Sequence, residues 1–179
     1  MLFRIIQALQ RSLQRQKIKT FARRVSFGDL VTDRAQNAKE YGFGEGTTCY
    51  DNVLILGDVK VGKNCWIGPN VVLDGAGGLE IGDFVCITAG AQIYSHDSSR
   101  RFVNFGKTSD PRSPTKIGSG VYIGPQAVVT MGVTIGDRVM IGAMSFVNKD
   151  VPSGSTAFGQ PARARLRDEQ RDEENPTAT

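Results

Sequence analysis

One side chain in the sequence is suited to moving a proton near neutral pH. His96 is the only histidine in the 179 residues, and an unperturbed imidazole titrates near pH ~6.5. It follows an apolar pair, Ile93 and Tyr94, and it opens a long segment that lacks the pattern found elsewhere in the chain. A neutral imidazole at such a place can take a proton from a hydroxyl or an amine that attacks a carbonyl, and a base of this kind typically contributes ~10²–10⁴-fold to a rate. We therefore take His96 as the candidate catalytic base.

Other reactive side chains are weaker candidates. Ser95 and Ser98 flank the histidine, but no second base accompanies them, which disfavours a covalent intermediate. A zinc site built from three histidines needs more imidazoles than the chain has, and the three cysteines form no metal motif. We expect no metal and a direct reaction between two bound substrates. Either Asp97 or a backbone carbonyl is expected to orient the imidazole.

A six-residue repeat sets the elements that must position His96. Each unit opens with an apolar residue, usually branched, and carries a small or β-branched residue at its fifth position. The opening residues are Phe43, Cys49, Ile55, Val61, Ile67, Leu73, Ile81, Ile87, Ile93, Ile117, Ile123, Val129, Ile135, Ile141 and Val147. The clearest fifth positions are Val121, Ala127, Val133, Val139, Ser145 and Val151.

This repeat predicts an all-β solenoid. Side chains alternate across a strand, so positions one and five can point to the same side, while the intervening Gly, Asp, Asn and Ser supply turns. A six-residue unit cannot bury its own aliphatic side chain and must stack on its neighbours. The expected domain is a parallel β-helix over residues 43–160. The repeat does not give handedness, and the usual rule for parallel crossovers favours a right-handed coil.

A Gly-rich stretch, 74–78, makes the first break in the repeat and shifts its frame by two residues. We expect the stretch to bulge outward, because the solenoid interior is already filled. It is interpreted either as a passive loop or as a wall of the acceptor pocket that includes Asp74. Asn70 is a comparable candidate for an acceptor contact, although an Asn at such a corner also serves as a turn residue.

The segment 97–115 makes the second break. It separates Ile93 from Ile117 by 24 residues, which equals four units, so the frame survives while its pattern disappears. A structureless excursion of this length within a compact domain is uncommon and usually functional. Its basic residues Arg100, Arg101 and Arg112 are candidates for binding the phosphates of a nucleotide-sugar acceptor, or else they are solvated.

The Ile-Gly-x-x-Val-x units resemble those of the hexapeptide-repeat acyltransferases. The histidine segment at 93–97 and the ending Phe-Gly-Gln-Pro-Ala-Arg at 158–163 narrow the resemblance to bacterial sugar acetyltransferases of the galactoside and surface-polysaccharide type. The resemblance covers about residues 43 to 166. It implies a left-handed parallel β-helix with three units per turn, a homotrimer, and a loop at 97–115 that reaches a neighbouring subunit.

The same resemblance implies where acetyl-CoA, the acyl donor, binds. The family contacts its donor along the outside of the C-terminal coils, at positions that correspond here to Pro125, Ala143, Asn148, Lys149 and Arg163. Lys149 and Arg163 suit the phosphates because both are cationic. Pro125 departs from the pattern because it has no N–H to donate, and Leu166 stands where a second arginine is common. Family contacts with the acceptor lie near Asn70 and Asp74.

The flanks of the repeat carry most of the charge asymmetry. Residues 2 to about 18 are predicted to form a helix, because apolar residues recur at three- and four-residue spacing. Residues 1–24 hold seven basic residues and no acid. This helix is expected to pack on its own solenoid or on a neighbouring subunit, or to rest on an anionic membrane surface. Residues 25–42 are expected to form a lead-in with a short strand at Val25–Phe27.

The C-terminal segment, 161–179, is expected to form a short charged helix from Ala162 to about Glu174 and a disordered tail from Asn175.

Composition excludes several classes of protein. The net charge is only +4 and no aromatic or motif signature accompanies the basic residues, so a nucleic-acid partner is not expected. No apolar run reaches the ~18–20 residues of a membrane span, and Arg4 interrupts the apolar start of the chain, which does not fit a signal peptide. Cys49 and Cys65 occupy interior repeat positions, so we expect buried thiols in a reducing compartment, the cytoplasm, or the inner face of its membrane.

Together these features favour an acetyltransferase that moves an acetyl group from acetyl-CoA to a sugar hydroxyl in polysaccharide or lipopolysaccharide biosynthesis, with His96 as the general base. The acceptor is expected to be a small sugar or a nucleotide sugar. Two alternatives remain open. One is N-acetylation of an amino sugar on a nucleotide carrier, and the other is a non-catalytic β-helix scaffold.

Overall fold

The solenoid predicted from the six-residue repeat is present in the structure, a computed structural model that describes residues 1–167. Its strands are mostly two residues long, with the first residue facing outward and the second, which opens a unit in the sequence, facing inward. The alternation expected of an extended chain therefore places every second side chain in the core. Between strands the chain turns sharply, and residues such as Asn64 and Asn70 adopt positive φ values of 56° and 58°.

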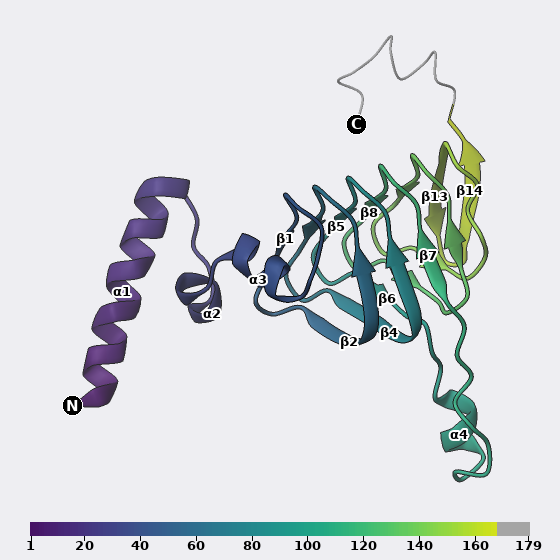
Figure 1. Ribbon diagram of the computed structural model, residues 1–179, viewed down its shortest axis with the longest axis horizontal. Coiled ribbons are helices and arrows are strands. Elements are labelled where there is room, and N and C mark those ends of the chain that lie inside the picture. The colour runs from purple at the N-terminus through teal and green to yellow at the C-terminus, as the bar shows by residue number, and fades with distance from the viewer. Residues whose placement is uncertain (168–179) are drawn as a thin grey trace.

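Three parallel faces make up the solenoid (Figure 1). The strands of the first face are β1 (Thr48–Cys49), β3 (Trp66–Ile67), β5 (Cys86–Ile87), β8 (Tyr122–Ile123), β11 (Met140–Ile141) and β13 (Ser155–Gly159). The second face contains the first halves of β2 (Leu54–Val61) and β4 (Val72–Ile81), followed by β6 (Gln92–Ile93), β9 (Val128–Val129) and β12 (Phe146–Val147). The third face contains the second halves of β2 and β4, followed by β7 (Thr115–Ile117), β10 (Thr134–Ile135) and the bridge residue Val151.

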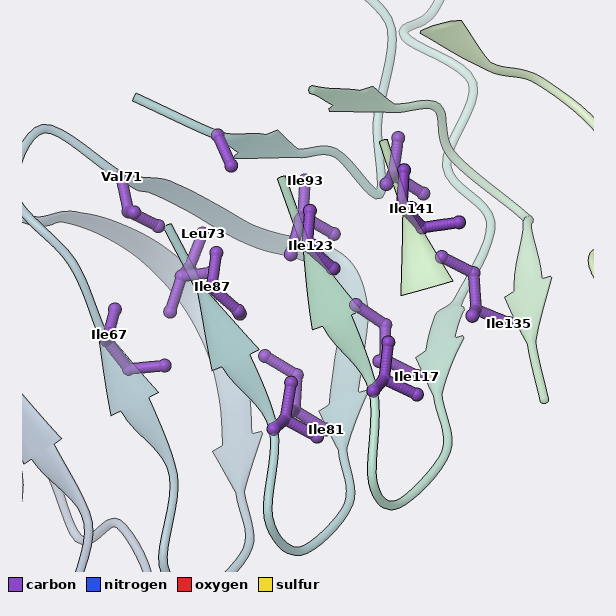
Figure 2. Close-up of a cluster of buried hydrophobic side chains, with 14 of the residues drawn as sticks. Ile67, Val71, Leu73, Ile81, Ile87, Ile93, Ile117, Ile123, Ile135 and Ile141 are labelled. Atoms are coloured by element: carbon purple, nitrogen blue, oxygen red, sulfur yellow. The ribbon is translucent and has the colours of Figure 1, made fainter. Parts of the chain in front are cut away.

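The core is a set of aliphatic ladders, one for each face (Figure 2). Ile67, Ile87, Ile123 and Ile141 stack along the first face with no exposed surface. Burying one such side chain stabilises the fold by about 1.5–3 kcal/mol. The fifth-position residues named from the sequence are buried as well. Each coil is therefore held mainly by the coils on either side of it.

Three helices precede the solenoid: α1 (Leu2–Phe21), α2 (Phe27–Val31) and α3 (Arg34–Glu40). The helix predicted from residue 2 is confirmed, but it does not pack on its own solenoid, because it has no buried residue and contacts α2. The strand expected at Val25–Phe27 is wrong. The Ser26 hydroxyl accepts a hydrogen bond from the Asp29 N–H at 3.3 Å and so caps the start of α2.

A buried ion pair fixes the short helices to the first coil. The guanidinium of Arg34 donates two hydrogen bonds of 2.7 Å to the carboxylate of Asp29, which is almost fully buried. The same guanidinium lies 3.5 Å from the ring centroid of Tyr50, and hydrogen bonding to Asp29 raises the pKa of Arg34. Because the paired geometry satisfies both charges, loss of either partner would leave a buried charge unpaired.

The C-terminal end of the solenoid closes with a strand and not with the expected helix. Strand β14 (Ala162–Leu166) runs antiparallel to β13 and pairs with it along five residues. The prediction of a helix from Ala162 is wrong for 162–166, because the last strand of a solenoid leaves an unpaired backbone edge that a following extended segment can satisfy. The rest of that predicted helix and the predicted disordered tail lie outside the described residues.

An arm leaves the solenoid between β6 and β7 (Figure 1). It starts and ends at an antiparallel bridge between His96 and Arg112, and the Asp97 N–H donates to the carbonyl of Pro111 at 3.0 Å. The segment expected to be structureless contains the short helix α4 (Ser99–Val103). Figure 1 shows α4 projecting away from the coils, so the arm is held at its base alone.

Candidate active site

Both breaks in the sequence repeat lie at one corner of the solenoid, between the second and third faces. The first break falls within β4, which rounds this corner, and the second follows β6, which pairs with the start of β4 in the next coil. Asp74 and His96 follow paired residues of these strands and therefore come together. The Gly-rich stretch does not simply bulge outward, because Asp74 has no exposed surface.

The carboxylate of Asp74 is the centre of a hydrogen-bond network. Its Oδ1 accepts from the Ala76 N–H at 2.9 Å, and its Oδ2 accepts from the backbone N–H groups of Ser95 and His96 at 3.1 and 3.2 Å. Oδ2 also bonds directly to Nδ1 of the His96 ring. Four donors thus converge on one buried acid, and two of them fix the backbone that carries the imidazole.

This network keeps Asp74 ionised. Burial by itself raises the pKa of a carboxyl, but the hydrogen bonds from Ala76, His96 and Ser95 together outweigh burial, so the pKa of Asp74 is below its ordinary value. An ionised carboxylate only accepts hydrogen bonds, so Nδ1 of His96 must carry a proton. In the neutral ring Nε2 is then left with the lone pair, which is the tautomer a general base requires.

The His96 ring forms part of the wall of a cavity of about 420 Å³. Its side chain is 27% exposed, so it is neither enclosed in the core nor freely solvated. The lining residues come from the end of β6, the start of the arm and the corner one coil further on: Tyr94, His96, Asp97, Ser98, Thr130 and Met131. This volume lies within the range that holds small ligands.

Asp97 does not orient the imidazole. Its carboxylate accepts from the backbone N–H of Ser99 at 2.8 Å and from the Ser99 hydroxyl at 2.9 Å, contacts that lower the pKa of Asp97. Successive side chains on an extended chain point in opposite directions, so the partner of the His96 ring comes from the neighbouring coil. Asp97 lines the cavity all the same.

The arginines of the arm make different contacts. Arg100 and Arg101 both lie on exposed positions of α4, and Arg101 is 3.5 Å from Asp110 within the arm. Arg112 donates to the carbonyl of Ala76 at 3.2 Å and ties the base of the arm to the Gly-rich stretch. Neither Arg100 nor Arg101 lines the His96 cavity.

Two of the candidate donor-binding residues meet at the C-terminal end. Lys149 and Arg163 line one hollow of about 230 Å³, together with residues of the last coil and β14. Asp150, which adjoins Lys149, uses its Oδ1 to accept the Thr134 N–H at 2.8 Å. Asn148 is exposed beside them. A pair of exposed cations at one hollow suits a group that carries phosphates.

The other candidates occupy corner positions. Pro125 and Ala143 are exposed residues one coil apart, and the Pro125 carbonyl accepts from Met144 N–H at 2.8 Å. Asn70 has a positive φ of 58°, and its side-chain oxygen accepts from Asn52 at 2.9 Å. This position fits the turn-residue interpretation of Asn70.

Sequence reasoning missed part of the cavity wall and the role of Asp74 as the partner of His96. Asp74 was named as an acceptor contact, yet its side chain is fully buried and the structure places it behind the imidazole. Tyr94, Thr130 and Met131 were not named as site residues. The sequence repeat could have predicted this proximity. Leu73, Ile93 and Val129 open units that stack on the second face, so the residues that follow them lie at the same corner.

Among residues 1–167, no three His, Cys, Asp or Glu side chains gather closely enough to hold a metal ion.

Comparison with known families agrees with the repeat geometry. The family description "Bacterial transferase hexapeptide (six repeats)" matches residues 114–149, and "Hexapeptide repeat of succinyl-transferase" matches residues 58–95. Both matches are to hexapeptide repeats and support the family resemblance drawn from the sequence. The matched ranges contain β2 to β6 and β7 to β12, apart from the start of β2, which are the coils on either side of the arm.

Relatives of this hexapeptide-repeat chain are named acetyltransferases. The galactoside O-acetyltransferase of Escherichia coli (strain K12) is 34% identical over 114 residues, which are 63% of this chain and 46% of that protein. The enzyme of the same name from Lactococcus lactis is 30% identical over 129 residues, 71% of this chain and 53% of that protein. The chain thus spans about half the length of the curated relatives it matches.

Solved structures share the solenoid. A hexapeptide-repeat-containing acetyltransferase from Vibrio cholerae superposes with a TM-score of 0.58 and 28% identity, over 91% of this chain and 93% of that chain. AntD, an N-acyltransferase from Bacillus cereus solved with dTDP and 3-hydroxybutyryl-CoA, gives a TM-score of 0.64 at 23% identity over 75% and 77% of the two chains. At this identity the second likeness concerns the fold alone.

Proposed function

We propose that this hexapeptide-repeat protein is an acetyltransferase that moves an acetyl group from acetyl-CoA to a hydroxyl of a sugar, with His96 as the general base. The observation that carries this proposal is the buried Asp74 carboxylate bonded to Nδ1 of a histidine that lines a ligand-sized cavity. An unneeded buried acid would be costly. The names of the relatives at 30% and 34% identity support the same class of reaction.

The reaction follows from the tautomer of the ring. Nε2 of His96 accepts the proton of the acceptor hydroxyl while the hydroxyl oxygen forms a bond to the thioester carbonyl carbon of acetyl-CoA. The tetrahedral intermediate then expels the CoA sulfur, and the proton on Nε2 passes to the departing thiolate. His96 ends each cycle neutral, as it began.

Asp74 supports the ring through the step in which the imidazole is charged. The ionised carboxylate faces Nδ1–H throughout, and a hydrogen bond between two charged partners is about twice as strong as a neutral one. Asp74 is therefore a positioning residue, since its side chain has no exposed surface with which to touch either substrate.

The donor is proposed to lie along the C-terminal coils, with its phosphates at Lys149 and Arg163. Their shared hollow supports this placement. Asn148 is adjacent, and Pro125 and Ala143 lie on exposed corners of the preceding coils. Pro125 offers a carbonyl but no N–H, so it contributes shape and not a donated hydrogen bond.

The acceptor is proposed to be a small sugar or nucleotide sugar of polysaccharide or lipopolysaccharide biosynthesis. It would enter the cavity beside Tyr94 and Met131, where an aromatic and an apolar side chain suit the faces of a sugar ring. An amine acceptor is the alternative, and the solenoid shared with AntD motivates testing it. Arg100 and Arg101 are proposed as phosphate contacts only if the arm of a neighbouring subunit approaches the cavity.

A homotrimer is the proposed assembly. The outer side of the second face carries Leu54, Val72, Gln92, Val128 and Phe146, all apolar except Gln92, whereas the third face carries Lys60, Glu80, Lys116 and Thr134, with Glu80 and Lys116 3.6 Å apart. An apolar face beside a charged one supports burial of the second face between subunits. The arm supports the same arrangement, because Phe105 at its tip is 92% exposed. Free buried thiols at Cys49 and Cys65 support a cytoplasmic location.

Turnover of acetyl-CoA with a panel of sugars tests the proposal. The variant His96→Ala should lower kcat by ~10²–10⁴-fold while the KM for acetyl-CoA stays within a few-fold. Acceptors that differ only in a hydroxyl or an amine at one carbon distinguish O- from N-acetylation. A non-catalytic scaffold is the correct interpretation if the folded wild-type protein turns over no sugar, or if His96→Ala is as active as wild type.

A further inference from the structure

Helix α1 presents an apolar stripe that no described part of the chain covers. Leu2, Ile5, Ile6 and Leu9 recur at three- and four-residue spacing and so share one side of the helix. Their exposed fractions range from 42% to 71%. The helix is held at its other end, where Gln14 donates to the Arg23 carbonyl at 3.1 Å and Lys17 reaches the Asp29 carbonyl at 3.4 Å. The first two turns are therefore free to contact something else.

The charge of residues 1–24 indicates which kind of partner can bind the apolar stripe of α1. Seven basic residues and no acid occur in residues 1–24. Arg4, Arg11 and Arg15 share the side of α1 opposite to the apolar stripe, and Lys19, Arg23 and Arg24 follow near its C-terminal end. Pairing of this helix with a second copy through the stripe would cover the apolar residues but would leave the basic residues without an acidic partner, because residues 1–24 contain no acid. An anionic surface with an apolar interior satisfies both the stripe and the charges.

We propose that α1 lies along an anionic phospholipid bilayer, with Leu2, Ile5, Ile6 and Leu9 inserted at the level of the acyl boundary and the basic residues near the headgroups. Amphipathic helices with a basic polar face and a low net hydrophobicity bind membranes in this way. None of the helices within residues 1–167 is both long enough and apolar enough to cross the bilayer, so α1 would rest on the surface.

The position of α1 in the molecule permits this contact. Figure 1 shows α1 at the N-terminal end of the solenoid, separated from the coils by α2 and α3 and on the far side from β14. The arm with α4 leaves the solenoid at a different place along its axis. A surface that binds α1 therefore meets the molecule at the end opposite to β14. Docking through α1 is independent of the acyl transfer proposed above.

Co-sedimentation with lipid vesicles tests this docking on the full chain. We expect binding to phosphatidylcholine vesicles that contain phosphatidylglycerol, and little binding to phosphatidylcholine alone. Two variants form a matched pair, because each lowers the charge by one: Leu9→Glu on the stripe and Arg11→Gln on the opposite side. Leu9→Glu should weaken binding on the order of fiftyfold, whereas Arg11→Gln should weaken it by no more than about fivefold. Glu and Leu have similar helix propensities, so α1 should remain helical.

Controls separate this docking from other causes. Circular dichroism and acetyl-CoA turnover with a soluble acceptor should be the same for Leu9→Glu as for wild type. The proposal is overturned if wild type ignores the anionic vesicles, or if Leu9→Glu and Arg11→Gln weaken binding equally, which would indicate charge attraction alone. It is also overturned if Leu9→Glu lowers the oligomer mass measured by light scattering, because the stripe would then lie between copies of the chain.

Discussion

Replacement of Asp74 by Asn tests whether the buried acid supports the chemistry at His96. Asn keeps one oxygen and replaces the other by an NH₂ group, which cannot accept a hydrogen bond. Three donors converge on Oδ2 and one on Oδ1, so the amide oxygen should occupy the Oδ2 position. The NH₂ group then faces the Ala76 N–H, and one buried donor is left unpaired at a cost of about 1–3 kcal/mol in folding free energy.

The effect on catalysis comes from the lost charge. The bond from Nδ1–H to a carboxylate, about 1.5–3 kcal/mol, becomes a neutral bond of about 0.5–1.5 kcal/mol, and the charged imidazole of the reaction loses roughly 1–1.5 kcal/mol of support. Since each 1.36 kcal/mol changes a rate about tenfold, kcat should fall by roughly tenfold. The KM for acetyl-CoA should change little, because Asp74 touches neither substrate.

Steady-state kinetics of Asp74→Asn, His96→Ala and the double variant measure this coupling. Because Asp74 acts through His96, the double variant should be no slower than His96→Ala alone. Each purified variant must show the same oligomer mass as wild type. Our reasoning fails if Asp74→Asn retains full kcat, or if the two losses multiply in the double variant.

Three further predictions follow from the electrostatics of the chain. The pKa of Asp74 is lower in the folded state than in the unfolded chain, so its contribution to stability is complete above pH ~4 and is lost as the pH falls through its folded pKa; melting temperatures should therefore converge between wild type and Asp74→Asn in acid, and parallel curves would contradict this. Burial raises the pKa of the Cys49 thiol to about 12, so iodoacetamide at pH ~8 should label Cys49 only after unfolding, as mass spectrometry of peptides would detect; rapid labelling of the native protein would be inconsistent with its position. Lys149→Ala and Arg163→Ala should each raise the KM for acetyl-CoA by roughly tenfold with little change in kcat, whereas Lys60→Ala on the third face should change neither, and equal effects of all three would remove the donor site from the C-terminal hollow.

The solenoid was predictable because its physical cause is periodic. Each opening residue, such as Ile67 or Ile141, must be buried for its coil to stay attached, so the spacing in the sequence is the spacing of the core. The position of His96 at the wall of a cavity was predictable because the residue stands alone at the edge of a long break in that spacing. Local pattern was sufficient for both.

What could not be predicted depends on the neighbouring coil. Asp74 lies 22 residues from His96 and belongs to the other break, so no local pattern joins them. The charged segment after Ala162 has a composition that favours a helix, but the open edge of β13 offers backbone hydrogen bonds to an extended chain. The opposite error occurred at Val25–Phe27, where a strand was expected. The hydroxyl of Ser26 caps the chain there, so a helix begins at Phe27.

The corner that holds Asp74 and His96 is a part of the solenoid from which no coil can be removed without loss of the site. Excising a whole coil elsewhere, in register, would shorten the rod and leave its stacking intact, because every layer there resembles the next. Between β4 and β9 the acid, the imidazole and the opposing wall at Thr130 and Met131 come from three successive layers. Removing any one of these layers would separate the members of the site, so length variation should not be tolerated across this stretch.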